Sequence, residues 1–204
     1  MDRRTFLYSL GMTGCALALP SGSFAVSRPL VAYFSKAGEQ YGVGVISKGN
    51  TAIAAEIIAR KTGADLCEIT VENDAYPREY KPLCDVAKAE LNSNARPAYR
   101  KTVADISGYD VIFVGAPVWW GDWPMVMYTF FERENLEGKI LIPFSTHAGS
   151  GLSGFDKKLA KACPKSRVAA GLAITGSDAQ KRSGRVESEV EGWLKKLAAQ
   201  GVVF

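Results

Sequence analysis

The sequence predicts an α/β fold in which a doubly wound, five-stranded parallel sheet carries helices on both faces. Short apolar runs alternate with longer stretches of helical periodicity, which is the pattern of βαβ units around a parallel sheet. Two of the runs, Asp110–Val114 and Lys139–Phe144, are continuous and apolar, as strands covered on both faces must be. Right-handed crossovers then place the strand-to-helix loops at one sheet edge, where such folds bind ligands.

The predicted elements follow one another in order. Leu30–Phe34 opens the sheet, and Thr51–Lys61 is a helix with alanine and isoleucine at helical spacing that Gly63 ends. The last helix has one apolar stripe, which predicts packing against the sheet. The remaining strands are Ala64–Val71, Asp110–Val114, Lys139–Phe144 and Arg167–Ile174; the remaining helices are Tyr80–Leu91, Met125–Glu132, Gly154–Ala162 and Ser183–Gln200, whose stripe is Val186, Val190, Trp193, Leu194 and Leu197.

Residues 1–25 are predicted to be a removable targeting segment. Arg3 and Arg4 form a charged start, Phe6–Leu19 is an almost uncharged apolar run, and small residues precede a cleavage point after Ala25. A permanent membrane helix needs about 20 apolar residues, which is more than this run offers. We therefore expect an exported protein without a permanent membrane span.

The start of this segment resembles a twin-arginine signal. Arg3–Leu7 matches the pattern Arg-Arg-x-Phe-Leu, which directs folded proteins to the periplasm. The resemblance implies that a cofactor acquired in the cytoplasm is exported with the protein. An ordinary export signal that contains two arginines is one alternative. Lipidation at Cys15 is another, although Met12 is a poor match to a lipoprotein processing site.

Residues 26–204 have the size of one domain and enough chain to bury a substantial core. The formal charge of the whole chain is +4. The first 25 residues include one acid and two arginines, so the remainder carries +3. Without clusters of lysine and arginine, this charge does not indicate nucleic-acid binding. Cys67, Cys84 and Cys163 have no metal-ligand spacing, and either one disulfide or three thiols fits their number.

The loop after the first strand has the composition of an anion site. It begins with Ser35 and Lys36 and meets the next helix at Gly49, Asn50 and Thr51. Hydroxyl groups, a glycine that permits close approach, and the amides of a helix N-terminus together favour a phosphate. In the alternative interpretation Asn50 is only an N-cap and Gly49 only a turn residue.

The loop Gly115–Pro124 contains three tryptophans within five residues. Trp119, Trp120 and Trp123 cannot all be buried by a loop at a sheet edge, so we expect aromatic surface that faces a ligand or a partner. The alternative is that the tryptophans are wedged into the core between the loop and the next helix.

The loop Ser145–Gly151 combines glycines with hydroxyl groups and His147, the chain's only histidine. A lone histidine suggests catalysis, but the sequence has no serine-elbow motif and no evident carboxylate partner for it. The composition therefore favours ligand binding over a hydrolase.

These three loops together resemble the flavodoxin-like family, in particular its bacterial branch with an extended first loop. The matching segments are Ala32–Ser35 leading to Gly49–Thr51, then Gly115–Asp122, then Pro143–Gly151. All three occur in the family's order, and the resemblance covers nearly all of the chain after the targeting segment. It implies a flavodoxin-like sheet, an FMN cofactor and electron transfer.

The resemblance assigns residues position by position. Ser35, Lys36, Asn50 and Thr51 match the loop that binds the FMN phosphate, and Gly49 permits the approach. Beside the isoalloxazine ring lie the matches Pro117, Val118, Trp119, Trp120 and Gly121, and on its other side Thr146, His147, Gly149, Ser150 and Gly151. The flavin would supply the redox chemistry while the protein tunes it by stacking and hydrogen bonds.

The chain departs from the family pattern in two ways. Tyr41–Lys48 intervenes between Ser35 and Asn50, so the amides that reach the phosphate are not defined by the pattern. Flavodoxins that act as electron carriers are also strongly acidic, whereas this chain is basic, which favours reduction of a small acceptor such as a quinone. The electron donor is left open between NAD(P)H and a reductase protein. The alternative function is an exported, non-redox binding protein on a flavodoxin-like fold without its cofactor.

Overall fold

The computed structural model describes residues 28–74 and 76–204, so the predicted targeting segment lies outside the described residues. The elements in chain order are β1 (Leu30–Phe34), β2 (Gly38–Gln40), β3 (Gly44–Ile46), α1 (Asn50–Thr62), β4 (Asp65–Val71), the 3₁₀ turn η1 (Glu72–Asp74), α2 (Tyr80–Ser93), β5 (Tyr99–Lys101), β6 (Val111–Pro117), α3 (Met125–Arg133), β7 (Ile140–His147), α4 (Phe155–Ala162), β8 (Arg167–Val168), β9 (Leu172–Thr175), α5 (Gly176–Lys181) and α6 (Ser183–Ala199).

The central sheet confirms the predicted α/β class. Its strands lie in the order β5-β4-β1-β6-β7, and both β8 and β9 pair with the outer side of β7. Every pairing is parallel except that of the short edge strand β5 with β4. Since the chain leaves β1 for a neighbour on one side and later crosses to β6 on the other, the carboxyl ends of β1 and β6 form a topological switch point.

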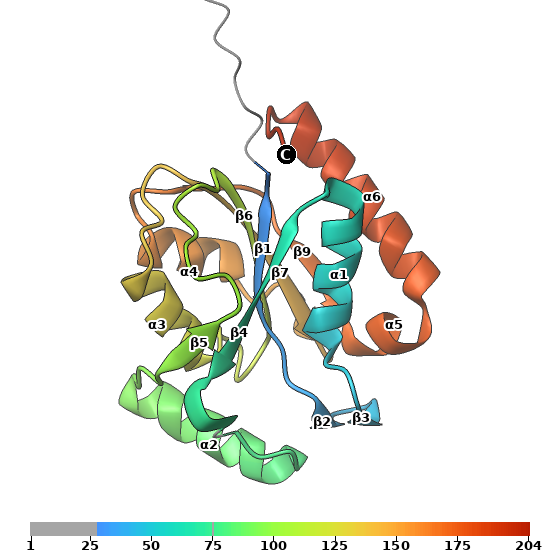
Figure 1. Ribbon diagram of the computed structural model, residues 1–204. Helices are drawn as coiled ribbons and strands as arrows, with labels where there is room; N and C mark the ends of the chain where they lie inside the picture. Colours follow the sequence, from blue (N-terminus) through green and yellow to red (C-terminus); the bar gives the residue numbers. More distant parts are fainter. Residues whose placement is uncertain (1–27, 75) are drawn as a thin grey trace, which may run out of the picture.

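Alternate residues of the central strands enter two separate cores. In β1, Leu30, Ala32 and Phe34 belong to the core under α3 and α4, while Val31 and Tyr33 belong to the core under α1 and α6. Figure 1 shows these helix pairs on opposite faces of the sheet. The predicted apolar stripe of the last helix is buried in the second core, which confirms that it packs against the sheet.

The sheet differs from the predicted five parallel strands at both edges. The predicted strand Arg167–Ile174 is divided into β8 and β9, which pair with different parts of β7. Leu141 O accepts a hydrogen bond from Ala169 N–H, so residue 143, two positions on, faces the same neighbour. Pro143 has no N–H to donate there, and the ladder is interrupted. At the other edge β5 has only three residues, too few to leave a pattern in the sequence.

The loop after β1 also holds structure that the sequence did not predict. β2 and β3 form a small antiparallel hairpin in the segment between β1 and α1.

Over the described residues, no helix has the length and hydropathy needed to cross a membrane.

Candidate functional site

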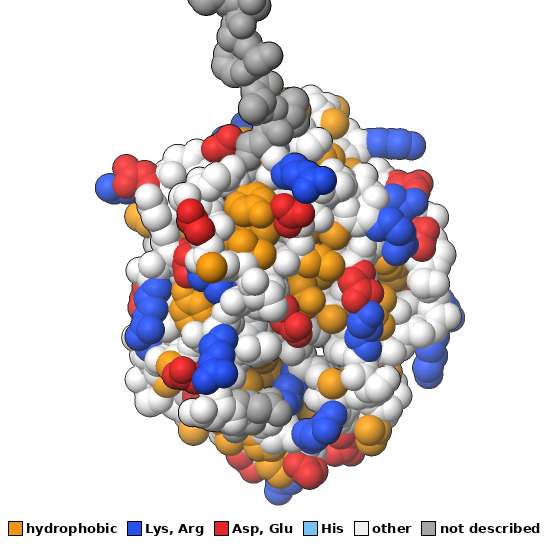
Figure 2. All heavy atoms as spheres, in the orientation of Figure 1, with side chains coloured by type: hydrophobic (Ala, Val, Ile, Leu, Met, Phe, Trp, Pro, Cys, Tyr) orange, Lys and Arg blue, Asp and Glu red, His pale blue; other side chains and the backbone are white. Residues whose placement is uncertain are grey.

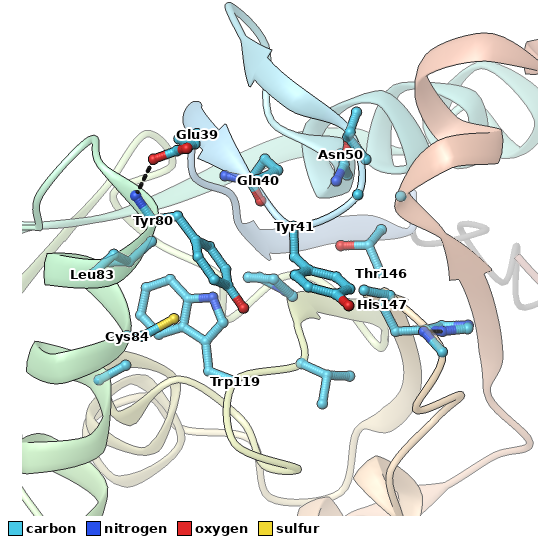
Figure 3. Close-up of a pocket in the computed structure, with 18 of the residues that line it drawn as sticks. Glu39, Gln40, Tyr41, Asn50, Tyr80, Leu83, Cys84, Trp119, Thr146 and His147 are labelled. Carbon is cyan, nitrogen blue, oxygen red and sulfur yellow. Dashed lines mark hydrogen bonds between the residues drawn. The ribbon is translucent and has the colours of Figure 1, made fainter.

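A cavity of about 650 Å³ opens at the carboxyl edge of the sheet, where the loops after β1, β6, β7 and β9 meet the side of α2. Its size lies within the range of small-molecule sites. Figure 3 shows its residues arriving from these separate segments. The lining residues are Glu39, Gln40, Tyr41, Gly42, Val43, Asn50, Tyr80, Leu83, Cys84, Asp85, Ala87, Pro117, Val118, Trp119, Trp120, Thr146, His147, Ala148, Gly149, Thr175, Gly176 and Ser177.

The first turn of α1 is closed by the loop that precedes it. Ser35 Oγ accepts a hydrogen bond from Ala52 N–H at 3.0 Å, and the first intrahelical bond runs from Ile53 N–H to Gly49 O. The amides of Asn50 and Thr51 precede that bond and lie at the positive end of a 13-residue helix. A Cβ on Gly49 would lie 2.2 Å from Ser35 Oγ, so the missing side chain accommodates the loop itself.

The side chain of Asn50 is fixed at the polar end of the cavity. Its Oδ1 accepts a hydrogen bond from Gln180 Nε2 at 2.9 Å, and its amide nitrogen packs over Gly176, where a Cβ would lie 2.5 Å away. Thr51 points elsewhere. Its hydroxyl is buried against that of Thr146, 2.7 Å away, and so joins α1 to the end of β7.

Residues Trp119–Asp122 form a tight turn whose two central residues have a left-handed backbone conformation. Trp119 and Asp122 exchange two backbone hydrogen bonds of 3.0 and 2.9 Å, and the two residues between them, Trp120 and Gly121, have φ of 52° and 73°. Positive φ at both central positions is the signature of a type I′ turn, which glycine adopts freely and tryptophan does not. The turn therefore holds Trp120 in a conformation that other contacts must support.

The three tryptophans have three different environments. Trp123 is 1% exposed and stacks on Phe155 at 3.7 Å, so the interpretation as core is correct for this residue. Trp119 is half-buried and lines the cavity, its ring edge-on to Phe34 and Tyr76 at 5.4 and 5.1 Å. Trp120 is 54% exposed.

The indole of Trp120 ties the turn to α2. Its Nε1 donates to Cys84 O at 3.0 Å, and the ammonium of Lys88 lies 4.7 Å from the ring centroid. A cation over an exposed indole contributes about 0.5–1 kcal/mol. These contacts account for the left-handed backbone at this residue, and they make the turn and α2 one continuous wall.

The third loop presents a neutral histidine. His147 Nδ1 accepts a hydrogen bond from Gly149 N–H at 3.0 Å, and burial lowers the pKa of the imidazole below its ordinary value. Since Nδ1 is an acceptor, the proton of the neutral ring is on Nε2. His147 therefore offers one N–H donor at the cavity wall, as a ligand with ring carbonyls or nitrogens would require.

Eight of the fifteen residues predicted to bind the cofactor line the cavity, and the others lie in the segments that support it. The lining group is Asn50, Pro117, Val118, Trp119, Trp120, Thr146, His147 and Gly149; the supporting group is Ser35, Lys36, Gly49, Thr51, Gly121, Ser150 and Gly151. Gly151, for example, accepts a hydrogen bond through its carbonyl from the buried Ser145 hydroxyl.

The structure adds three groups of lining residues that the sequence reasoning missed. They are the hairpin residues 39–43, the α2 residues Tyr80, Leu83, Cys84, Asp85 and Ala87, and the residues Thr175, Gly176 and Ser177 after β9. Tyr41, Gly42 and Val43 of the first group fall in the insertion Tyr41–Lys48, whose departure from the family pattern was the available signal. The second lies on a helix whose approach to the cavity only the tertiary fold defines.

The described cysteines are all free thiols, as one of the two interpretations expected. Burial raises the pKa of the Cys163 thiol to about 11 and also raises that of Cys67. Cys84 is half-buried in the cavity wall one helical turn from Tyr80, and burial together with a hydrogen bond to this thiol raises the pKa of the Tyr80 hydroxyl. Among the described residues no group of three or more histidine, cysteine or acidic side chains is placed to hold a metal ion.

Known structures share this architecture. A predicted flavoprotein of Bacteroides eggerthii is 29% identical, with a TM-score of 0.64 over 84% of this chain and 98% of its own. One of Bacteroides uniformis is 25% identical, with a TM-score of 0.61 over 83% and 98%. A Lactobacillus acidophilus flavoprotein in complex with FMN is 22% identical, with a TM-score of 0.59 over 77% and 99%.

The family comparison covers most of the described domain. No curated protein matches the chain significantly. The family model described as flavodoxin matches residues 28–191, which include every loop that lines the cavity. The chain therefore belongs to the flavodoxin family.

Proposed function

We propose that this protein binds FMN in the cavity and acts as an FMN-dependent oxidoreductase that reduces a small organic acceptor such as a quinone. The composition of the cavity carries the proposal. Neutral polar groups of Asn50, Thr175 and Ser177 line it together with the aromatic ring of Trp119. Membership of the flavodoxin family and the FMN complex of the Lactobacillus relative support it.

The residues of the cavity suit a phosphate and a flat ring. Asn50 and the amides that begin α1 would hold the phosphate without a cationic side chain, as helix N-termini do. Trp119 would form one wall beside the ring, in a position already fixed by Phe34 and Tyr76. His147 would donate from Nε2 to a ring oxygen or nitrogen.

When bound, FMN would accept two electrons from a reduced nicotinamide or a reductase protein and pass them, with two protons, to a quinone that leaves as hydroquinone. The chain's own contribution is to hold the ring, to supply donors of fixed direction and to exclude water from one side of it.

The charge of the protein favours a small acceptor over a protein partner. The formal charge is +4, and Figure 2 shows acidic and basic side chains interspersed over the face in view. An electron carrier that docks through an acidic face needs a field of one sign to steer its partner.

The proposal predicts flavin binding followed by turnover. Purified protein titrated with FMN is expected to quench flavin fluorescence at a stoichiometry of one. After photoreduction without oxygen, the flavin of the loaded protein should be reoxidised by one equivalent of 1,4-naphthoquinone, as its absorbance will report. A folded protein that leaves FMN fluorescence unchanged would contradict the redox function. Reoxidation only by a redox protein would identify a carrier instead.

We also propose that the chain is exported through a twin-arginine signal. Arg3 and Arg4 support this, within residues 1–25 that lie outside the described part of the chain. Replacing both by lysine is expected to reduce the amount in the periplasmic fraction to background while the cytoplasmic form keeps its FMN. Equal export of the variant would point to the ordinary signal.

A further inference from the structure

The β2–β3 hairpin carries an aromatic side chain to the cavity. Tyr41 lies in the turn between the two strands, where Val43 N–H bonds to Gln40 O at 3.3 Å and Gly42 has φ of 70°. Its ring lies 5.9 Å from that of Tyr80, tilted by 37°. Figure 3 shows the two rings projecting side by side into the cavity.

The hairpin is attached to the start of α2, so the two rings are held together. Glu39 N–H donates to Arg78 O at 2.8 Å, and Glu39 Oε2 accepts from Tyr80 N–H at 2.9 Å. Gly38 permits the two segments to approach this closely, because a Cβ at this position would collide with Arg78 O. The two hydrogen bonds of Glu39 therefore hold the hairpin that carries Tyr41 against the start of α2, which carries Tyr80.

This aromatic pair has no role in either core. Tyr41 is 65% exposed and Tyr80 38% exposed, and neither belongs to the two buried clusters. Leu83 and Cys84 continue the same wall one helical turn further along α2. Contiguous aromatic surface that is left exposed at the mouth of a cavity indicates a ligand with a flat apolar face.

Both charged residues that line the cavity are acidic. Among its lining residues, all of them in the described part of the chain, Glu39 and Asp85 are carboxylates and none is lysine or arginine. Two carboxylates at the cavity wall repel a bound anion and leave a neutral molecule unaffected.

We propose that Tyr41 and Tyr80, with Leu83 and Cys84, form the acceptor subsite, and that it takes a neutral planar aromatic molecule in preference to an anionic one. The inference rests on the proposed function and names the substrate class of the same cavity. The rings supply the flat surface, and Glu39 and Asp85 supply the discrimination against an anionic molecule.

The test compares 1,4-naphthoquinone with its 2-sulfonate, which differ in one negative charge. Stopped-flow reoxidation of photoreduced, FMN-loaded protein should saturate at about fivefold lower concentration of the neutral quinone. Glu39→Gln combined with Asp85→Asn should remove most of this difference. Equal preference in the parent protein would overturn the charge argument.

Replacing Tyr41 by leucine tests the aromatic surface. The concentration of neutral quinone at half-saturation is expected to rise about five- to tenfold, while the limiting rate and the FMN dissociation constant are unchanged. Val45→Thr, on the same hairpin but outside the cavity, is the control, since Val45 is 83% exposed and does not line the site. A rise in the FMN dissociation constant instead would show that Tyr41 covers the flavin and would overturn the proposal.

Binding without turnover separates this inference from the proposed function. The quinones are titrated into the protein and into Tyr41→Leu while quenching of intrinsic fluorescence is recorded. If the parent binds the neutral quinone more tightly, the variant loses that preference, and no reoxidation occurs, the subsite stands and the redox function fails. If reoxidation is normal and the variant binds both quinones as the parent does, the subsite fails.

Discussion

Gly115→Ala is expected to lower the free energy of unfolding by about 3 kcal/mol, the upper end of the cost of overpacking a core. Gly115 lies in the central strand β6 opposite Phe144 of β7. A Cβ there would lie 2.0 Å from Cζ of the Phe144 ring, which is fully buried and covers the glycine. β6 cannot move away from β7 without disturbing its pairing with β1 on the other side. The midpoint of urea unfolding measures the effect.

Two further variants make this expectation specific. Phe144→Leu in the Gly115→Ala background should recover part of the loss, because the smaller side chain vacates the space that the methyl group needs. Gly192→Ala, in the exposed middle of α6 with nothing within 4 Å of the added Cβ, should raise stability by about 0.5–1 kcal/mol. An unchanged midpoint in Gly115→Ala alone would refute the close contact.

Gly176→Ala is expected to weaken FMN binding about tenfold or more while the protein stays folded. The added Cβ would lie 2.5 Å from Nδ2 of Asn50, the far end of a side chain that can rotate away. Rotation would break the hydrogen bond from Gln180 and remove the amide from the polar end of the cavity. A hydrogen bond to a charged group contributes about 1.5–3 kcal/mol, which corresponds to a tenfold or larger change in the dissociation constant.

The matched control and a double variant separate position from size. Gly184→Ala, near the start of α6, adds the same methyl group in open space and should leave the fluorescence titration unchanged. Asn50→Ala should weaken binding as Gly176→Ala does, and the two together should cost little more than either alone, since both act through one side chain. Additive losses would show that Gly176 acts by another route.

Strands and helices with enough residues to repeat a pattern were predictable. The apolar run at Leu30–Phe34 and the stripe from Val186 to Leu197 lie where their periodicity placed them. The division of the last strand was not predicted, because it depends on Pro143 in the neighbouring strand rather than on the segment itself. β5 is specified by its pairing with β4, which leaves no local signal in three residues.

The site was predictable where it follows directly from a strand and not where it depends on tertiary contacts. Pro117–Trp120 and Thr146–His147 line the cavity because β6 and β7 end beside it. Tyr41 and Tyr80 meet only because a hairpin and a distant helix are joined through Glu39. Trp119 and Trp123 are close in the sequence but have different environments, because the type I′ turn between them reverses the chain.

The residues of the β2–β3 hairpin differ in how strongly a substitution would disturb the packing of the protein. Gly38 and Ile46, at its base, are buried, whereas Tyr41 and Gly42 at its tip make no contact with either core. Replacing Tyr41 therefore disturbs neither core, whereas Gly42 has φ of 70° and resists substitution by a residue with a side chain. If the hairpin forms the proposed acceptor subsite, evolution at position 41 would change the preferred acceptor while both cores stay constant.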